Sequence, residues 1–323
     1  MLSDLAQSLA KLGLSHVHAA SVVQYAQLMP SDGVAARCAQ LHFGVSNGVI
    51  TAEEANTLVH EQPEFLRCEY TVAYKDEHLV AVDKPWDALL SPDKRGPRWD
   101  GEVSLRDWLR EAHPETMTED GSGEVRLCHN LDFATSGVIV AAKSKVVAND
   151  VSRCFRERVA RKLYCALVFG HPSWDACTWD ARIQPSTRKF KQRISGGGKK
   201  AETEVFVGAR GRLRVGEHAG REASLLWLTP HTGRRHQLRL HCAHGGHPIV
   251  GDLTYADDRL MYRMFLHAAA LELPLESAAY QPDAPVRVEA PLVPAGWADV
   301  FELDDTVSSP EGWPGAAERL HRG

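Results

Sequence analysis

The apolar positions near the start of the chain recur at helical spacing. Leu5, Leu9 and Leu12 lie three or four residues apart, so they share one face of a helix. Further on, the run Thr51-Ala-Glu-Glu54 has the pattern of a capping box, which is typical of a helix start and predicts a helix over Ala52–His60. We therefore expect residues 1–66 to form a helical N-terminal extension.

After Glu69 the pattern changes to short strands mixed with helices. Period-two alternation and short apolar runs predict two short strands within 70–85, joined by a charged turn at 75–77, and further strands at 125–128, 138–142, 163–169, 224–228 and 265–273. Helical spacing predicts helices at 104–112, 144–159 and 235–243. Because the order has no regular strand–helix–strand rhythm, we expect an α+β domain, a large mixed or antiparallel sheet flanked by helices. This domain should span 67–303, with 304–323 as a flexible C-terminal tail.

Charge is distributed unevenly along the chain. The whole sequence has 37 Lys and Arg against 42 Asp and Glu, but 153–239 has 19 against 7. Within this stretch, 184–200 is a basic, glycine-rich segment that we expect to be a mobile loop. A basic region on an acidic chain favours a surface that binds a polyanion, although a merely solvated basic surface remains the alternative.

Other bulk features limit where the protein works. There is no run of about 18 apolar residues, so no membrane span is predicted. The first residues lack the basic and apolar segments of a secretory signal. The seven cysteines are scattered and form no CxxC pair, which favours reduced thiols. We expect a cytoplasmic protein, with the nucleus or an organelle left open, and a monomer.

One carboxylate stands out from the pattern. Asp132 lies in a short polar loop that leads through Thr135-Ser136-Gly137 directly into the apolar stretch Val138–Ala142. Such a loop can hold an ionised group at the edge of a dry pocket. An aspartate in a turn can equally serve only to stabilise the turn through its own hydrogen bonds.

Four blocks in order resemble the RluA-type pseudouridine synthases. CHNLDFATSG (128–137) is similar to the family motif H-x-L-D-x-x-T-S-G, and LVAVDKPWDALLSP (79–92) to its K-P-x-G-L entry, although Trp86-Asp87-Ala88 lacks the glycine. FRERVARKLYCALVFG (155–170) and TGRRHQLRLHCAHGGHPIVGDLTY (232–255) resemble the two later blocks. The cysteine before His129 and the phenylalanine after Asp132 are most similar to the eukaryotic RNA pseudouridylate synthase domain-containing branch.

The resemblance implies a pseudouridine synthase fold and an enzyme that isomerises uridine to pseudouridine in rRNA or tRNA. It implies that Asp132 is the nucleophile, that Tyr164 stacks on the flipped base, and that Arg239 pairs with the aspartate. It implies RNA as the partner and no cofactor. From the residues alone, Tyr164 could instead be a core tyrosine, and Arg239 a surface residue of a helix.

The basic stretch and the motif loops supply the candidate RNA contacts. These are Asn130, Arg153, Arg156, Arg158, Lys162, Arg188, Lys189, Lys200, Arg234 and His236, with Lys191 and Arg193 nearby in the basic segment. Lys200 could bind phosphate or only close a turn. Asn130 departs from the family, which usually has arginine there. An amide has neither the charge nor the stacking plane of a guanidinium, so the base-flipping step is expected to differ.

Two other chemistries are considered. His241, His244 and His247 have spacings that could bind zinc, but they lack the cysteine and carboxylate spacing of known zinc sites, so no metal is expected. A hydrolytic N-glycosidase would need a second carboxylate across the scissile bond, and the motif contains one. A catalytically inactive RNA-binding or ribosome-assembly factor on the same fold is the main alternative, because of Asn130 and the altered Trp86-Asp87-Ala88.

Overall fold

One extended mixed sheet organises the part of the chain that the structure describes. The computed structural model describes residues 70–92, 103–120, 122–188, 191–214, 218–258, 261, 263–277, 280, 282–290, 297–304, 308 and 313. The predicted N-terminal extension at 1–66 lies outside these residues. Within them, no helix is long and apolar enough to cross a membrane.

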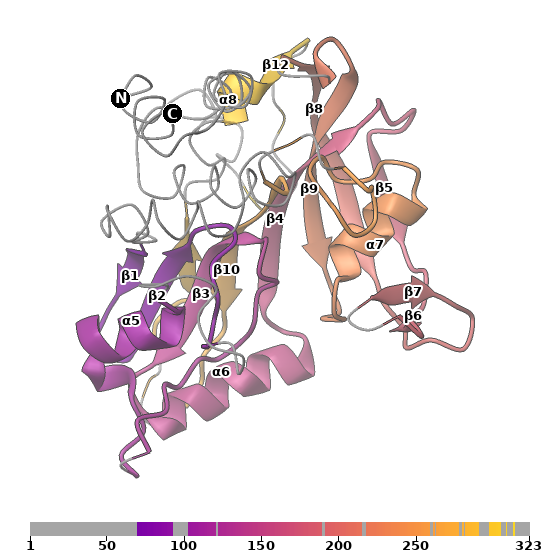
Figure 1. The fold of residues 1–323 in the computed structure, drawn as a ribbon. Helices are drawn as coiled ribbons and strands as arrows, with labels where there is room; N and C mark the ends of the chain where they lie inside the picture. The colour runs from indigo at the N-terminus through magenta and orange to yellow at the C-terminus, as the bar shows by residue number, and fades with distance from the viewer. Residues whose placement is uncertain are drawn as a thin grey trace, which may run out of the picture.

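The sheet runs through the whole described domain (Figure 1). Its strands follow the order β1 (Thr71–Lys75), β2 (Leu79–Lys84), β3 (Ser136–Ala142), β10 (Leu266–Leu273), β4 (Arg161–Phe169), β9 (Glu222–Pro230), β8 (Thr203–Leu213) and β12 (Phe301–Leu303). In addition, β11 (Val286–Glu289) pairs with β10, and β5 (Ala176–Trp179) pairs with β8. Only β3 and β10 pair in parallel among these described strands, so the sheet is mixed. This agrees with the α+β class predicted from the sequence.

Helices cover both faces of one half of the sheet. Alternation along β2 directs Leu79 and Ala81 toward α6 (Lys145–Glu157), while Val80 and Val82 pack with α5 (Leu105–Ala112). Each helix begins at a serine N-cap, Ser104 for α5 and Ser144 for α6. The short helix η2 (Pro114–Thr116) follows α5, and α8 (Trp297–Val300) directly precedes β12.

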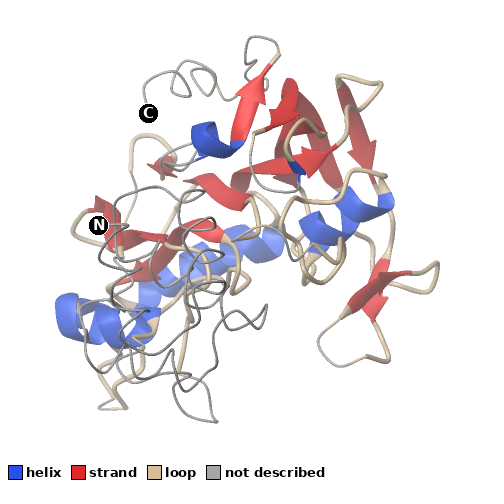
Figure 2. Cartoon of the chain, turned by 45° about the horizontal axis from the view of Figure 1, so that its top comes forward, coloured by secondary structure: helices blue, strands red, loops and turns tan. Residues whose placement is uncertain are grey.

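The other half of the sheet is covered by α7 (Gln237–His244). Its Leu238 and Cys242 pack against apolar residues of β4, β8 and β9. Below α7, the hairpin of β6 (Ile183–Pro185) and β7 (Gln192–Ile194) stands apart from the main sheet (Figure 2). The sequence predicts a loop over 184–200. A hairpin forms because Ile183 pairs with Ile194 and both pack toward α7, an apolar pair hidden among basic residues.

One other segment differs from the sequence prediction. The stretch 125–128 makes only isolated bridges, Met117 with Val125 and Leu127 with Ala141, in place of a strand. Of the tail predicted at 304–323, the structure describes Asp304, Ser308 and Trp313. Ser308 accepts a hydrogen bond from Trp227 (2.9 Å), and Trp313, 2% exposed, lies in the core. The rest of 305–323 lies outside the described residues.

Candidate active site

The loop that carries Asp132 is attached to the sheet on both sides. His129 Nε2 accepts a hydrogen bond from the Val140 amide (3.1 Å), which joins the start of the loop to β3. After Asp132, the Phe133 carbonyl accepts a hydrogen bond from the fully buried Lys84 ammonium (3.0 Å). Because a buried ammonium needs acceptors, Lys84 stabilises the loop only in this arrangement. The backbone at Asp132 is therefore held in place by residues far away in the sequence.

The exit from the loop depends on a close contact between two strands. Gly137 has φ +109°, and a Cβ at this position would overlap the Ala268 backbone of β10. One residue earlier, the Ser136 hydroxyl accepts a hydrogen bond from Arg263 (2.7 Å) and lies 2.8 Å from His267 Nδ1. The Thr-Ser-Gly segment thus joins the Asp132 loop to β10, because only glycine allows this approach.

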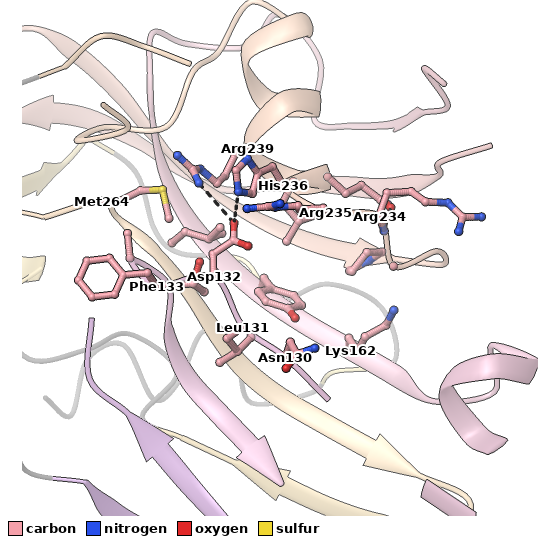
Figure 3. Close-up of a pocket in the computed structure, with 18 of the residues that line it drawn as sticks. Asn130, Leu131, Asp132, Phe133, Lys162, Arg234, Arg235, His236, Arg239 and Met264 are labelled. Atoms are coloured by element: carbon pink, nitrogen blue, oxygen red, sulfur yellow. Dashed lines mark hydrogen bonds and ion pairs between the residues drawn. The ribbon is translucent and has the colours of Figure 1, made fainter. Parts of the chain in front are cut away.

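Asp132 faces a buried guanidinium from α7. Arg239 Nη1 lies 3.4 Å from Asp132 Oδ2 (Figure 3). The same arginine donates two further hydrogen bonds to Asp252, at 2.8 Å and 2.7 Å. A bidentate pair of this kind fixes the plane of the guanidinium. Arg239 therefore presents its remaining donor to Asp132 in a defined direction.

Asp252 is a site residue that the sequence reasoning did not assign. Its side chain is 1% exposed and also accepts hydrogen bonds from the amides of Thr254 (2.8 Å) and Tyr255 (3.1 Å). Burial would lower the pKa of Arg239, but the hydrogen bonds and charge of Asp252, together with the charge of Asp132, raise it. Asp252 is the aspartate of the G-D-x-x-Y segment in the block 232–255, so the sequence motif contained it. Nothing in the motif indicates that this aspartate pairs with Arg239.

Lys162 and Tyr164 lie on the same face of β4 and line the floor of the site. Burial, and secondarily the charge of Asp132, raise the pKa of Tyr164, so its phenol stays protonated at neutral pH. Burial, with the nearby charge of Arg158, lowers the pKa of Lys162 to about 8. Lys162 Nζ has a long contact with the Thr232 carbonyl, at 3.5 Å. Figure 3 shows Lys162 and Asn130 on the side of Asp132 away from Arg239.

A cavity of about 1210 Å³ brings most of the candidate residues together. Those lining it are Asn130, Asp132, Arg156, Arg158, Lys162, Tyr164, Arg234, His236 and Arg239. One wall is the Asp132 loop and the end of α6, and the other is the segment 230–239 that leads into α7. The volume is larger than most small-molecule pockets, so it can hold more than one nucleotide. Cations lie on both walls.

Comparison with known proteins identifies the family. A family model described as RNA pseudouridylate synthase matches residues 78–244. The chain belongs to this family. Members isomerise uridine in RNA to pseudouridine, so the protein is an isomerase that acts on RNA. The sequence-based prediction of the family and of the enzyme class is confirmed.

Individual relatives agree with this assignment. RNA pseudouridylate synthase domain-containing protein 1 of Mus musculus is 36% identical over 241 residues, 70% of this chain and 73% of that protein. The dual-specificity RNA pseudouridine synthase RluA of Escherichia coli K12 is 34% identical, covering 62% and 85%. The solved structure of human RNA pseudouridylate synthase domain-containing 1 superposes with a TM-score of 0.59 at 28% identity, covering 79% and 94%. The fold is therefore that of an RluA-type pseudouridine synthase.

Some predicted RNA contacts of this pseudouridine synthase lie outside the cavity lining. Arg153 points along α6, where it pairs with Asp150 (2.9 Å) and Glu157 (3.1 Å). The Lys200 ammonium pairs with Glu202 (2.8 Å), and Arg188 is exposed in the turn of the β6–β7 hairpin. Lys189 lies outside the described residues. The periodicity of a helix shows which face is exposed, but it does not show which exposed cations already have acidic partners.

Two of the three histidines considered for zinc, His241 and His247, have other partners. His241 contacts Thr203 Oγ1 through Nδ1 and the Ala181 carbonyl through Nε2, both at 3.0 Å. His247 Nδ1 lies 3.0 Å from the Phe169 carbonyl. In the described residues, no group of three His, Cys, Asp or Glu side chains has the geometry of a metal site. His241 and His247 instead connect α7 and the following turn to the sheet.

Proposed function

We propose that the cavity binds one uridine of an RNA chain and that Asp132 is the nucleophile for its conversion to pseudouridine. The observation that carries the proposal is the Asp132–Arg239–Asp252 arrangement, in which a carboxylate that is 26% exposed faces the cavity while a buried, bidentately held arginine contacts one of its oxygens. A nucleophilic carboxylate must be ionised and oriented before the substrate arrives. Arg239 orients the carboxylate, because its guanidinium contacts one of the two oxygens.

The reaction needs little else from the protein. The C1′–N1 bond breaks as the Asp132 carboxylate attacks C1′, and the uracil leaves with the bonding electron pair. After the base turns, C5 attacks C1′ and releases the carboxylate. The C5 hydrogen then leaves as a proton, and N1 takes up a proton. Nothing is oxidised and no group is donated from outside, so the chemistry requires no cofactor.

Tyr164 is suited to hold the detached base. Its ring lines the cavity beside Asp132, and its raised pKa keeps the phenol neutral next to the carboxylate. An aromatic face binds a base by stacking, which allows the base to turn while it stays bound. Water must also be kept from C1′, and the apolar residues around the loop contribute to this.

The cations of the cavity walls are the proposed phosphate contacts. Arg156, Arg158 and Lys162 lie on one wall, and Arg234 on the other. Contacts to the phosphates on either side of the target uridine would compensate the few kcal/mol, roughly, that unstacking it requires. Asn130 lies exposed at the cavity and can donate or accept hydrogen bonds there. We propose rRNA or tRNA as the substrate class.

An assay on unmodified transcripts tests this function. Separate rRNA and tRNA pools transcribed in vitro contain uridine only, so any pseudouridine found by nucleoside chromatography is product. We expect pseudouridine with the wild-type protein and a loss of at least about a thousandfold in Asp132→Asn. The variant should fold, because Arg239 keeps both hydrogen bonds to Asp252.

The control is Asp175→Asn, an amide change at a surface carboxylate that is 83% exposed and paired with Arg210. It should retain full activity. Free uracil in place of pseudouridine would identify a hydrolytic N-glycosidase. Salt-dependent RNA binding without either product would identify an inactive RNA-binding factor. Full turnover by Asp132→Asn would refute the nucleophile assignment.

A further inference from the structure

His236 occupies a backbone position that histidine does not favour. It is the N-cap of α7, but its φ of 55° is left-handed and its side chain makes no capping hydrogen bond. Helix N-caps usually have extended backbone and a short side chain that accepts a hydrogen bond from the first turn. Glycine would adopt this conformation without strain, whereas a side chain costs about 1 kcal/mol. Strain of this kind occurs at functional sites, so the reason for histidine here lies in what its ring contacts.

The ring lies between the two halves of the site. Nε2 is 3.9 Å from Asp132 Oδ2, a charge–dipole contact longer than a hydrogen bond. On the other side, Nδ1 is 2.9 Å from the Tyr255 hydroxyl. Figure 3 shows the lines from His236 and from Arg239 meeting at one oxygen of Asp132. No hydrogen bond from the described residues reaches the other oxygen, Oδ1.

The hydrogen-bond network assigns the proton of the ring. The Tyr255 hydroxyl oxygen already accepts a hydrogen bond from the Gln192 amide (3.0 Å), so its own proton can be donated to His236 Nδ1. With Nδ1 as acceptor, the ring proton is on Nε2 and points toward Asp132. Burial lowers the pKa of His236 against the opposing charge of Asp132, so the ring is neutral at physiological pH. Arg239, Arg235 and Asp252 are the other charged groups that face it.

We propose that His236 is a positioning residue that, together with Arg239, holds Asp132 through Oδ2 and leaves Oδ1 to react with the ribose. This inference rests on the proposed function of Asp132. A neutral N–H dipole suits this role, because it orients the carboxylate without adding a second full positive charge that would weaken the nucleophile. Tyr255 in turn orients His236, since its hydroxyl determines which ring nitrogen carries the proton.

Tyr255 also explains how the ring is kept in place. Its aromatic ring lies 5.2 Å from the Arg239 guanidinium, and it packs with Ile183 and Leu240. Its amide donates a hydrogen bond to Asp252. The positioning pair therefore belongs to the same rigid unit that holds Arg239, and the two contacts on Oδ2 are set together.

The test is His236→Gly, which removes the ring and relieves the left-handed backbone. The matched control is Asp257→Gly, a second left-handed position (φ 50°) outside the cavity lining. Single-turnover and steady-state rates are measured by pseudouridine formation on the transcript that the wild-type enzyme modifies most. We expect kcat to fall on the order of tenfold to a hundredfold while KM stays within about threefold. Added imidazole should restore part of kcat in His236→Gly and have no effect on Asp257→Gly.

A second variant keeps the inference testable if His236→Gly does not fold, as judged by circular dichroism. Tyr255→Phe keeps the aromatic ring and loses only the hydroxyl, and we expect a smaller fall in kcat at unchanged KM. An unchanged kcat in the folded glycine variant, or a loss that imidazole does not reverse, overturns the positioning role. If His236→Gly is unfolded, an unchanged kcat in Tyr255→Phe also overturns the positioning role. Failure of the wild-type enzyme to form pseudouridine on any transcript would instead overturn the function proposed for Asp132.

Discussion

At the scale of single residues, the site is governed by buried charges and by which of them have partners. Arg239 is satisfied by Asp252 and faces Asp132, so its charge is already balanced before substrate arrives. Lys162 differs. Among the described residues no carboxylate lies within ion-pair distance of its ammonium, and Arg158 adds a second positive charge nearby. A cation held in this way favours the arrival of an anion, such as an RNA phosphate.

Lys162 predicts a pH dependence of RNA binding. Its pKa of about 8 means that the free enzyme loses this charge as the pH rises through 8, whereas a bound phosphate favours the charged form. The affinity of the enzyme for a transcript that it modifies should therefore fall about fivefold between pH 7 and pH 9, which corresponds to about 1 kcal/mol. Filter binding at constant ionic strength measures it.

Lys162→Arg is the control for this effect, because a guanidinium does not titrate in this range. Its affinity should stay constant from pH 7 to pH 9, and Lys162→Met should bind weakly at both. Equal pH dependence in the wild-type protein and in Lys162→Arg would assign the titration to another group.

At the scale of elements, the catalytic loop is determined by how closely β3 approaches β10. The two strands pair in parallel at Ser136 and Gly137, opposite His267 and Ala268. There is no room for a side chain at Gly137, and the strand bends there with positive φ. The position of the loop therefore follows from the sheet, and the apolar residues after Gly137 hold that strand in the core.

Gly137→Ala should destabilise the fold strongly. The added Cβ overlaps the Ala268 backbone and forces an unfavourable φ, so we expect a loss of about 3 kcal/mol in the free energy of unfolding. Gly123→Ala is the matched control, because Gly123 has φ +70° and no atom within 4 Å of the added carbon. It should lose only about 1 kcal/mol. Urea denaturation distinguishes the two, and similar losses would mean that β10 moves away readily.

At the scale of the whole molecule, the protein is acidic but has a group of cations around one cavity. The net charge is −5, yet the walls carry Arg156, Arg158, Lys162 and Arg234. The cavity forms where the two halves of the sheet meet over β4, so each half contributes one wall. A polyanion entering between them would contact both walls, while the acidic remainder of the surface repels it.

This arrangement predicts the salt dependence of RNA binding. Replacing Arg156 and Arg158 by glutamine should make the slope of log affinity against log salt concentration shallower by about two. The reason is that two fewer phosphate contacts release about two fewer counter-ions. Arg212→Gln is the control, because Arg212 is exposed at the end of β8 away from the cavity and contacts Glu222. It should leave the slope unchanged. An unaltered slope in the double variant would place the RNA elsewhere on the surface.

Local pattern was enough to predict much of this protein. Alternating positions predicted β1, β2 and β4, and helical spacing predicted the helix over 144–159 that contains α6, because periodicity acts within a few residues. The motif blocks predicted the family and the enzyme class. These features depend on neighbours in the sequence, so they can be recognised without any knowledge of the fold.

Only the tertiary structure decided which residues meet. Asp252 pairs with Arg239, Tyr255 orients His236, and Arg153 is bound to acidic neighbours on its own helix instead of lining the cavity. Trp313 packs into the core although its surroundings in the sequence are polar. Periodicity indicates that one face of an element is buried, but it does not name the partner. Those contacts arise when distant segments close around the same sheet, and the charge balance of the site is set at that point.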